Sequence, residues 1–157
     1  MKKFVAYMMT AVVLMTIGCQ DKDEIPIEEV PAQYIRTDGY VESGRYPVTT
    51  VISSQNDLEQ YCELYQDTYN LTKFREAINV YSNEFFADNF LIIVMLQEGS
   101  GSIRHRVKRI ESNGDIVICR LLPYLLTADM AAWNIIIEVN NDYGIGQFQV
   151  RLMDKPL

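Results

Sequence analysis

The spacing of apolar residues predicts helices in the middle of the chain. Beyond residue 54, apolar side chains recur every three or four positions, as one face of a helix requires: Leu58, Tyr61, Cys62, Tyr65 and Tyr69. Ser54, with Asp57 three residues later, is typical of a helix N-terminus. A second helix is predicted at 72–81, and one more turn from Ser82 to about Asn89.

The pattern changes to that of strands at residue 90. The run "FLIIVML" (90–96) is apolar at every position, which predicts a central strand covered on both faces. Asn113-Gly114 is a strong two-residue hairpin signal between the strand "SIRHRVKRI" (102–110) and the returning strand "DIVICRLL" (115–122). Two further alternating segments, at 132–140 and 147–153, predict late strands.

Residues 34–52 add one or two short strands before the helices. Short connections favour antiparallel neighbours, because a parallel crossover needs a longer link. We therefore expect an α+β fold, in which an antiparallel β-sheet of five or more strands carries two or three N-terminal helices. Residues 34–157 are enough for a single domain with its own core.

The first nineteen residues have the three parts of a bacterial export signal. Lys2 and Lys3 precede an apolar run that is too short for a comfortable membrane span, and "TIGC" ends it. This ending resembles the lipobox of bacterial lipoproteins, which predicts a signal peptide at 1–18 and a lipid on Cys19. An ordinary signal peptide or an uncleaved anchor is the alternative. A lipidated Cys19 places the protein outside the cytoplasm, on the cell membrane or the outer membrane.

Residues 19–33 are predicted to be an acidic, flexible tether that follows the lipidated cysteine. The segment "QDKDEIPIEEVPAQ" has five acids, two prolines and no helical or alternating period. Its acids also resemble signals that send some lipoproteins to the cell surface, although a solvated linker explains them as well. Fourteen residues reach at most about 45 Å, so the domain can stand clear of the bilayer.

Charge and composition exclude several functions. The whole chain has a net charge of −7, and removal of Lys2 and Lys3 with the signal peptide makes it −9. This acidity argues against general affinity for nucleic acid or anionic lipid headgroups. No sequence pattern predicts a cofactor, and a single histidine cannot form a typical zinc site. Cys62 and Cys119 are expected to be buried and free, with a disulfide as the alternative.

A basic strand is the first candidate binding site. Alternation places Arg104, Arg106 and Lys108 on one face, with Arg120 on the returning strand, in an array suited to carboxylates or phosphates. A solvated strand face is the simpler explanation. His105 alternates with these cations and is therefore expected in the interior, although a hydrolase using His105 remains an alternative. No nucleophile motif accompanies it, so we expect a protein that is not an enzyme.

The segment "LLTADMAAW" is the second candidate. Thr127, Asp129 and Trp133 combine a hydroxyl, an acid and a large aromatic ring, a mixture found at recognition surfaces. The alternative is a capped turn that covers the edge of the core.

Two resemblances follow from these motifs. The order "ISSQNDLEQYCELY", "FFADNFLIIVMLQEGSGSIRHRVKRI", "NGDIVICRLLP" and "AAWNIIIEV" is similar to the C-terminal domain of PrcB protease-complex accessory subunits. The chain also resembles a family of uncharacterised bacterial lipoproteins with "AQYIRT", "GSGSIRH" and "TADMA" before a tryptophan. The resemblance implies an extracytoplasmic, non-catalytic module that binds a protein partner or an envelope component. A subunit that stabilises or inhibits an extracytoplasmic protease is one form of this role.

Replacing Cys19 by Ser tests the lipid anchor. The substitution removes the thiol that accepts the diacylglyceryl group, so the protein should leave the membrane fraction for the soluble fraction. Fractionation followed by immunoblotting measures the change. A variant that fractionates like the unsubstituted protein would rule out the lipobox.

Overall fold

A computed structural model describes residues 30–37, 45–68 and 70–157. The predicted signal peptide, Cys19, most of the tether and Tyr69 lie outside the described residues. The first strand begins at Ala32, two residues before the predicted start of the domain.

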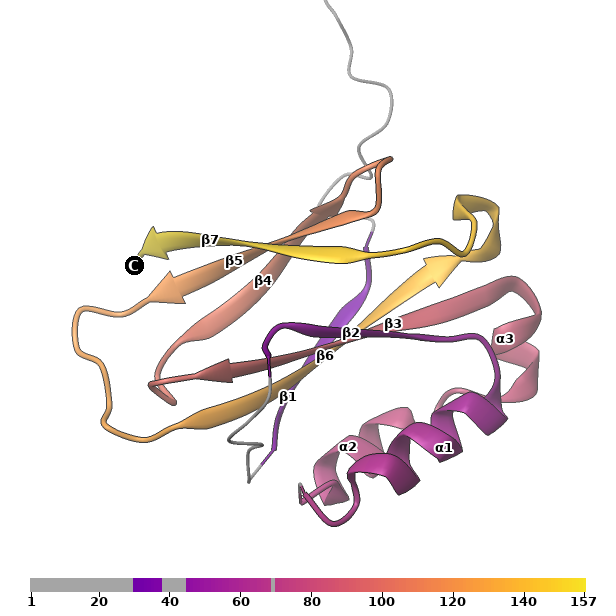
Figure 1. Ribbon diagram of the computed structural model, residues 1–157, viewed down its shortest axis with the longest axis horizontal. Coiled ribbons are helices and arrows are strands. Elements are labelled where there is room, and N and C mark those ends of the chain that lie inside the picture. Colours follow the sequence, from indigo (N-terminus) through magenta and orange to yellow (C-terminus); the bar gives the residue numbers. More distant parts are fainter. Residues whose placement is uncertain (1–29, 38–44, 69) are drawn as a thin grey trace, which may run out of the picture.

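The described residues form seven strands, three α-helices and one short 3₁₀ turn. In chain order they are β1 (Ala32–Thr37), β2 (Val48–Ile52), α1 (Gln55–Tyr65), α2 (Thr72–Ile78), α3 (Asn83–Asp88), β3 (Asn89–Glu98), β4 (Arg104–Ile110), β5 (Asp115–Leu122), β6 (Ala131–Asn140), η2 (Asn141–Tyr143) and β7 (Gln149–Pro156). The structure has three layers: a three-stranded sheet, a four-stranded sheet and the helices (Figure 1).

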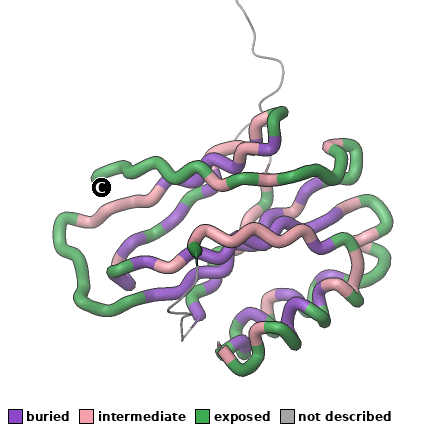
Figure 2. The backbone as a smooth tube through the Cα atoms, in the orientation of Figure 1, coloured by how far each residue is buried: buried purple, intermediate pink, exposed green. Residues whose placement is uncertain are grey.

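The four-stranded sheet is the middle layer, with the order β1-β6-β3-β2 and antiparallel pairing throughout. β3 and β6 are its central strands, and nearly all their residues are buried (Figure 2). Successive side chains of a strand point to opposite faces, so a strand covered on both sides must be apolar at every position. The prediction of a doubly covered strand at 90–96 is therefore confirmed.

One face of the middle sheet packs against the helices. Leu91, Ile93 and Met95 of β3 share a core with Leu58 and Phe74 of the helical layer. The predicted start of α1 is confirmed, because the Ser54 side chain accepts a hydrogen bond of 3.1 Å from the Asp57 N–H. The second helix is shorter than predicted and ends at Ile78.

The other face of the middle sheet packs against the three-stranded sheet, whose order is β4-β5-β7. Ile92, Val94 and Leu96 of β3 meet Ile116 and Ile118 of β5 in this second core. The predicted hairpin between β4 and β5 is confirmed, but its turn has three residues, 112–114, in place of the predicted two, because Glu111 pairs with Asp115. Its glycine, Gly114, has a φ of +87°, a value that favours glycine.

The predicted fold class is wrong in three respects. The strands form two sheets of four and three strands, the helices are not N-terminal, because β1 and β2 precede them as the strands predicted at 34–52 imply, and β7 pairs with β5 in parallel. The division into two sheets and the parallel pairing have one physical cause. The loop 123–130 carries the chain from one sheet to the other, so β6 follows β5 in sequence but belongs to the other sheet. Because β6 intervenes in the other layer, β7 returns beside β5 in the same direction. The fold is a mostly β, two-sheet sandwich with helices on one outer face.

Cys62 and Cys119 are both buried and free, as expected. Cys62 belongs to the helical layer, and Cys119 lies in the three-stranded sheet on the other side of β3 and β6. A disulfide between them is therefore excluded by the layered arrangement. Burial raises the pKa of the Cys62 thiol.

A chain of buried polar groups joins the helices to the middle sheet. The Tyr61 hydroxyl donates to Asn134 Oδ1 at 2.8 Å, and Asn134 Nδ2 donates to Thr37 Oγ1 at 3.2 Å. Asn134 has no exposed surface and lies on β6 between these partners. The amide thus satisfies two buried hydroxyls from different elements, α1 and β1.

Replacing Asn134 by Ala should lower the free energy of unfolding by about 3 kcal/mol, because two buried hydroxyls lose their partner. Chemical denaturation measures this value. Asn83→Ala, at an exposed position at the start of α3, is the control and should change stability little. A loss at Asn134 no larger than that at Asn83 would contradict the assigned role.

Candidate functional site

Two connections meet at one end of the sandwich, which we call the loop end. The turn 99–103 joins β3 to β4, and the loop 123–130 joins β5 to β6 (Figure 1). The C-terminus lies at the same end, since the Leu157 N–H donates to the Leu122 carbonyl at 3.0 Å. The β4–β5 hairpin and the start of β1 lie at the other end.

A cluster of buried ionisable side chains lies in the interior at the loop end. His105 Nε2 lies 2.8 Å from Glu98 Oε1, and Arg120 Nη2 donates to Glu98 Oε2 at 2.9 Å. Arg120 Nη1 also lies 3.3 Å from Asp154 Oδ1 on β7. The Glu98 and His105 side chains are 4% and 0% exposed. Glu98 therefore ties the end of β3 to β4 and β5, and Arg120 extends the link to β7.

Aromatic and cation–π contacts pack around the cluster of buried ionisable side chains. The ring centroids of His105 and Trp133 are 5.3 Å apart, and the Arg104 guanidinium carbon lies 5.6 Å from the Trp133 ring centroid. Three buried nitrogens, His105 Nδ1, Arg120 Nε and Trp133 Nε1, have no hydrogen-bond partner among the described residues. A substrate could reach the His105 imidazole only if the strands around it separated.

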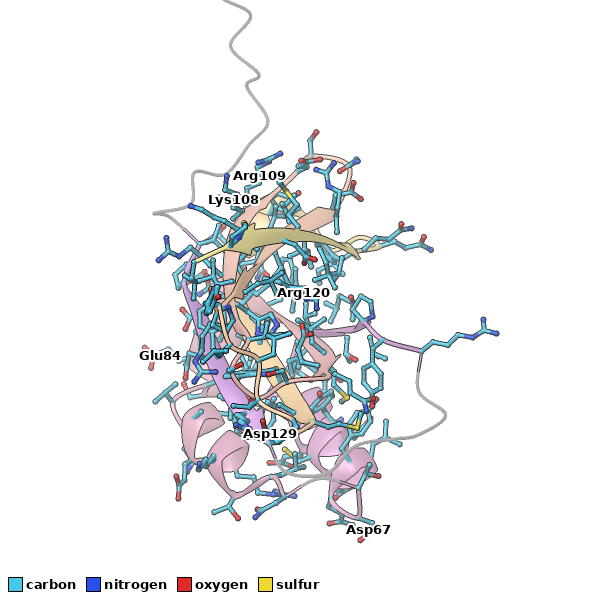
Figure 3. The ribbon with its side chains drawn as sticks, turned by 90° about the vertical axis from the view of Figure 1, so that its left-hand side faces the viewer. Asp67, Glu84, Lys108, Arg109, Arg120 and Asp129 are labelled. Carbon is cyan, nitrogen blue, oxygen red and sulfur yellow. The ribbon has the colours of Figure 1, made fainter. Side chains whose placement is uncertain are left out.

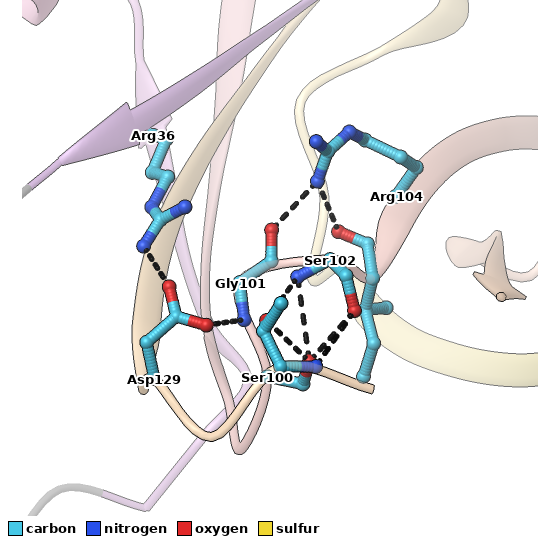
Figure 4. A network of polar contacts seen from close by, with 8 residues as sticks. Arg36, Ser100, Gly101, Ser102, Arg104 and Asp129 are labelled. Carbon is cyan, nitrogen blue, oxygen red and sulfur yellow. Dashed lines mark hydrogen bonds and ion pairs between the residues drawn. The ribbon is translucent and has the colours of Figure 1, made fainter. Parts of the chain in front are cut away.

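Hydroxyl groups fasten the turn 99–103 to the loop 123–130 (Figure 4). Ser100 Oγ lies 2.8 Å from Ser102 Oγ and 3.0 Å from Thr127 Oγ1. The Ser102 N–H donates to Thr127 Oγ1 at 3.1 Å. Arg104 Nη1 donates to the Gly101 carbonyl at 2.7 Å. These bonds hold the two connections in one conformation.

Asp129 links the same turn to β1. Its carboxylate accepts from Arg36 Nη2 at 2.6 Å and from the Gly101 N–H at 3.2 Å (Figure 4). A Cβ atom on residue 101 would lie 2.2 Å from Asp129 Oδ2, so only glycine allows this approach. Hydrogen bonds from Thr127, Arg36 and the Gly101 N–H lower the pKa of Asp129 to about 2.

The outer surface of the loop 123–130 is apolar and exposed. Tyr124, Leu125 and Leu126 are 97%, 77% and 61% exposed, and Met130 is 53% exposed. Four large apolar side chains in one short loop are unusual for a solvated connection, and such patches mark interaction sites. Hydrogen bonds of Thr127 and Asp129 fasten the same loop to the turn 99–103.

The structure brings five of the seven predicted binding residues, from both candidate sites, to the loop end. Arg104, Arg120, Thr127, Asp129 and Trp133 all lie at the loop end, whereas Arg106 and Lys108 lie farther along β4. His105 is in the interior beside Ile103 and Val107, as the alternation predicts.

The basic array itself differs from its prediction in two ways. Arg120 pairs in register with His105 and so points inward, away from Arg106. A β-bulge between Val107 and Arg109 interrupts the alternation at Lys108.

Sequence reasoning did not identify Glu98 or Arg36. Glu98 was recognisable as an acid at the end of an apolar strand, but its partners, His105 and Arg120, come from two other strands. Arg36 carries no local signal, because Asp129 lies 93 residues away in sequence.

Comparisons with family models, curated proteins and solved structures found no match to this chain. In the part of the chain that the structure describes, no helix has the length and apolar character needed to cross a bilayer. Within the same residues, no group of three His, Cys, Asp or Glu side chains is placed to hold a metal ion.

The low pKa of Asp129 predicts how the loop responds to acid. Because the folded-state value of about 2 lies below the usual 3.8, the carboxylate stabilises the loop above about pH 4. This contribution is lost as the pH falls toward 2. An NMR titration of the Gly101 amide should show a midpoint near 2, and Asp129→Asn should abolish that titration. A midpoint near 3.8 would contradict the bonding described here.

Proposed function

We propose that this chain is a lipid-anchored, extracytoplasmic binding module of the bacterial cell envelope, which holds a protein partner at its loop end. The export signal and the lipobox at Cys19 support the anchorage. The exposed apolar surface of the loop 123–130, braced by polar contacts, carries the binding role.

The loop is suited to binding because its conformation is set before a partner arrives. Thr127 and Asp129 join it to the turn 99–103, and Asp129 also joins it to β1. A preorganised loop loses little conformational entropy on association, so more of the contact energy contributes to affinity. Tyrosine and methionine are enriched at protein interfaces, and Tyr124 and Met130 are the corresponding side chains here.

The position of the loop leaves it accessible in an anchored protein. β1 starts beside the end of β6 and runs toward the loop end, where Thr37 pairs with Ala132. Ten residues of β6 span about 30 Å, which separates the apolar loop from the start of the domain. A partner can therefore reach the loop without displacing the anchor.

We propose that the module is not catalytic. The His105 imidazole is fully buried and hydrogen-bonded to Glu98, which suits a structural role. The hydrolase alternative needs a substrate-accessible imidazole and a nucleophile, and Ser100, Ser102 and Thr127 are engaged with one another. The resemblance to PrcB makes an extracytoplasmic protease complex the first class of partner to test.

Co-purification of the anchored protein from its native membranes tests this function. Replacing Tyr124 and Leu125 together by Asp should abolish recovery of the partner, because charges replace its apolar contacts. Val80→Asp is the matched control, since Val80 is 69% exposed but follows α2 in the helical layer. A photo-crosslinker at Leu126 should form a product with the same partner.

Two results would refute the binding role. One is a partner retained equally by the loop variant and the Val80 variant. The other is repeated recovery of the protein alone, with no crosslinked product from Leu126. Circular dichroism and thermal unfolding show whether each variant keeps its fold.

A further inference from the structure

The outer face of the three-stranded sheet carries a set of cations, which we call the cationic face. Register partners in a sheet point to the same side, so each row of the sheet can be assigned to a face. Arg109 and Arg151 flank Val117, and Arg106 and Met153 flank Cys119, in rows that alternate with the core residues Ile116 and Ile118. Register assigns Arg106, Arg109, Arg151 and Lys155 to the cationic face, and Lys108, in the bulge beside Arg109, is counted with them (Figure 3).

The long cationic side chains also cover this face. Val117 is 0% exposed although, among the described residues, no helix or second sheet packs on this side of β5 (Figure 1). Glu111 bridges Arg109, whose Nη2 lies 2.8 Å from Glu111 Oε1, and Arg151 on the other edge of the sheet. The two arginines flank Val117 in register, and long stems of this kind can cover an apolar residue while their charges remain at the surface.

Three cations of this face form no ion pair with an acidic side chain of the described residues. Arg106, Lys108 and Lys155 have no ion-pair partner within the described residues. Cations spread over a sheet face suit a surface with many anionic groups, whereas a single carboxylate ligand would require them to converge.

Charge is segregated between the outer layers of the molecule. The helical segment 53–88 has seven acids and two cations, a net charge of −5. The strands of the three-stranded sheet with their hairpin, 104–122 and 149–156, have seven cations and three acids, a net charge of +4. Figure 3 shows Lys108 and Arg109 at the sheet side and Asp67 at the helix side. The whole chain is acidic, but the layer formed by the three-stranded sheet is basic.

The described part of the chain begins near the hairpin end of β4, the strand that carries Arg106, Lys108 and Arg109. Val30 lines a pocket of about 430 Å³ together with Ile110, the last residue of β4, which follows Lys108 and Arg109. Eleven residues, 19–29, separate Val30 from the predicted lipid anchor and span at most about 36 Å. The cationic face is thus within reach of the membrane to which the anchor belongs.

We propose that the cationic face rests on the phosphate groups of anionic lipids in that membrane, with the helical layer turned away. The inference rests on the anchorage proposed above and deepens it. The diacylglyceryl group holds the chain at the membrane, and a basic surface adds a second, electrostatic contact that orients the domain. Each Lys or Arg at an anionic surface strengthens binding about fivefold. Screening limits the effect of the distant acids, because the Debye length is about 8 Å at physiological salt.

Vesicle binding tests this orientation without the lipid anchor. The chain from residue 19 onward, with Cys19→Ser, is mixed with phosphatidylglycerol–phosphatidylcholine vesicles or with phosphatidylcholine vesicles and sedimented. We expect the protein to bind to the anionic vesicles alone. Salt at 0.5 M should abolish this binding, because the Debye length falls to about 4 Å at that concentration. Arg106→Gln with Lys108→Gln should lower the partition coefficient about 25-fold, at about fivefold for each cation.

Lys73→Gln with Arg75→Gln is the matched control. It removes two exposed cations from α2 and changes net charge equally, so binding to the anionic vesicles should stay the same. Equal losses in both variants, or no binding to anionic vesicles, would overturn the proposal. Binding to polyglutamate but not to vesicles would also overturn it and indicate an acidic polypeptide. Because the assayed chain lacks the lipid and the apolar loop is unchanged, failure here is independent of Cys19 lipidation and of partner capture.

Discussion

The pairing of β3 with β6 is the constraint on which the rest of the structure depends. Both strands are apolar on both faces, so a single covering layer would leave one face in water. The helices cover the face that includes Leu91 and Ile93, and the three-stranded sheet covers the face that includes Ile92 and Val94. Three layers follow from this requirement. The same requirement sends β5 and β6 to different sheets and creates the loop 123–130 between them.

At the loop end, burial of the Glu98 carboxylate organises the polar groups. A buried charge must be paired, and Glu98 is paired with His105 and Arg120 from two neighbouring strands. The contacts above it, from Thr127 and Asp129, then hold the connecting loop outward. The interior polar groups therefore support the fold, while the exposed apolar side chains provide the surface for a partner. This division explains why the only histidine of the chain is not the accessible group at the loop end.

The layers also separate the charges. The middle sheet is apolar, so charged side chains gather on the two outer layers, and these carry opposite net charge. An asymmetric charge distribution orients a protein near a charged surface more effectively than its net charge suggests. The binding loop and the cationic face occupy different parts of the molecule. An anchored domain can consequently use one face toward lipid and one end toward a partner.

Local patterns in the sequence determined the elements, because helix caps, strand alternation and hairpin turns depend on neighbouring residues. Ser54 as a cap, the doubly buried strand at 90–96 and the inward position of His105 are examples, and each agrees with the structure. The division into two sheets, the parallel pairing of β7 and the inward position of Arg120 did not follow from sequence. These features depend on contacts between residues far apart in the chain, such as Arg36 with Asp129. Only tertiary packing decides them, since the loop between two strands does not specify whether the second strand joins the same sheet or the layer beneath it.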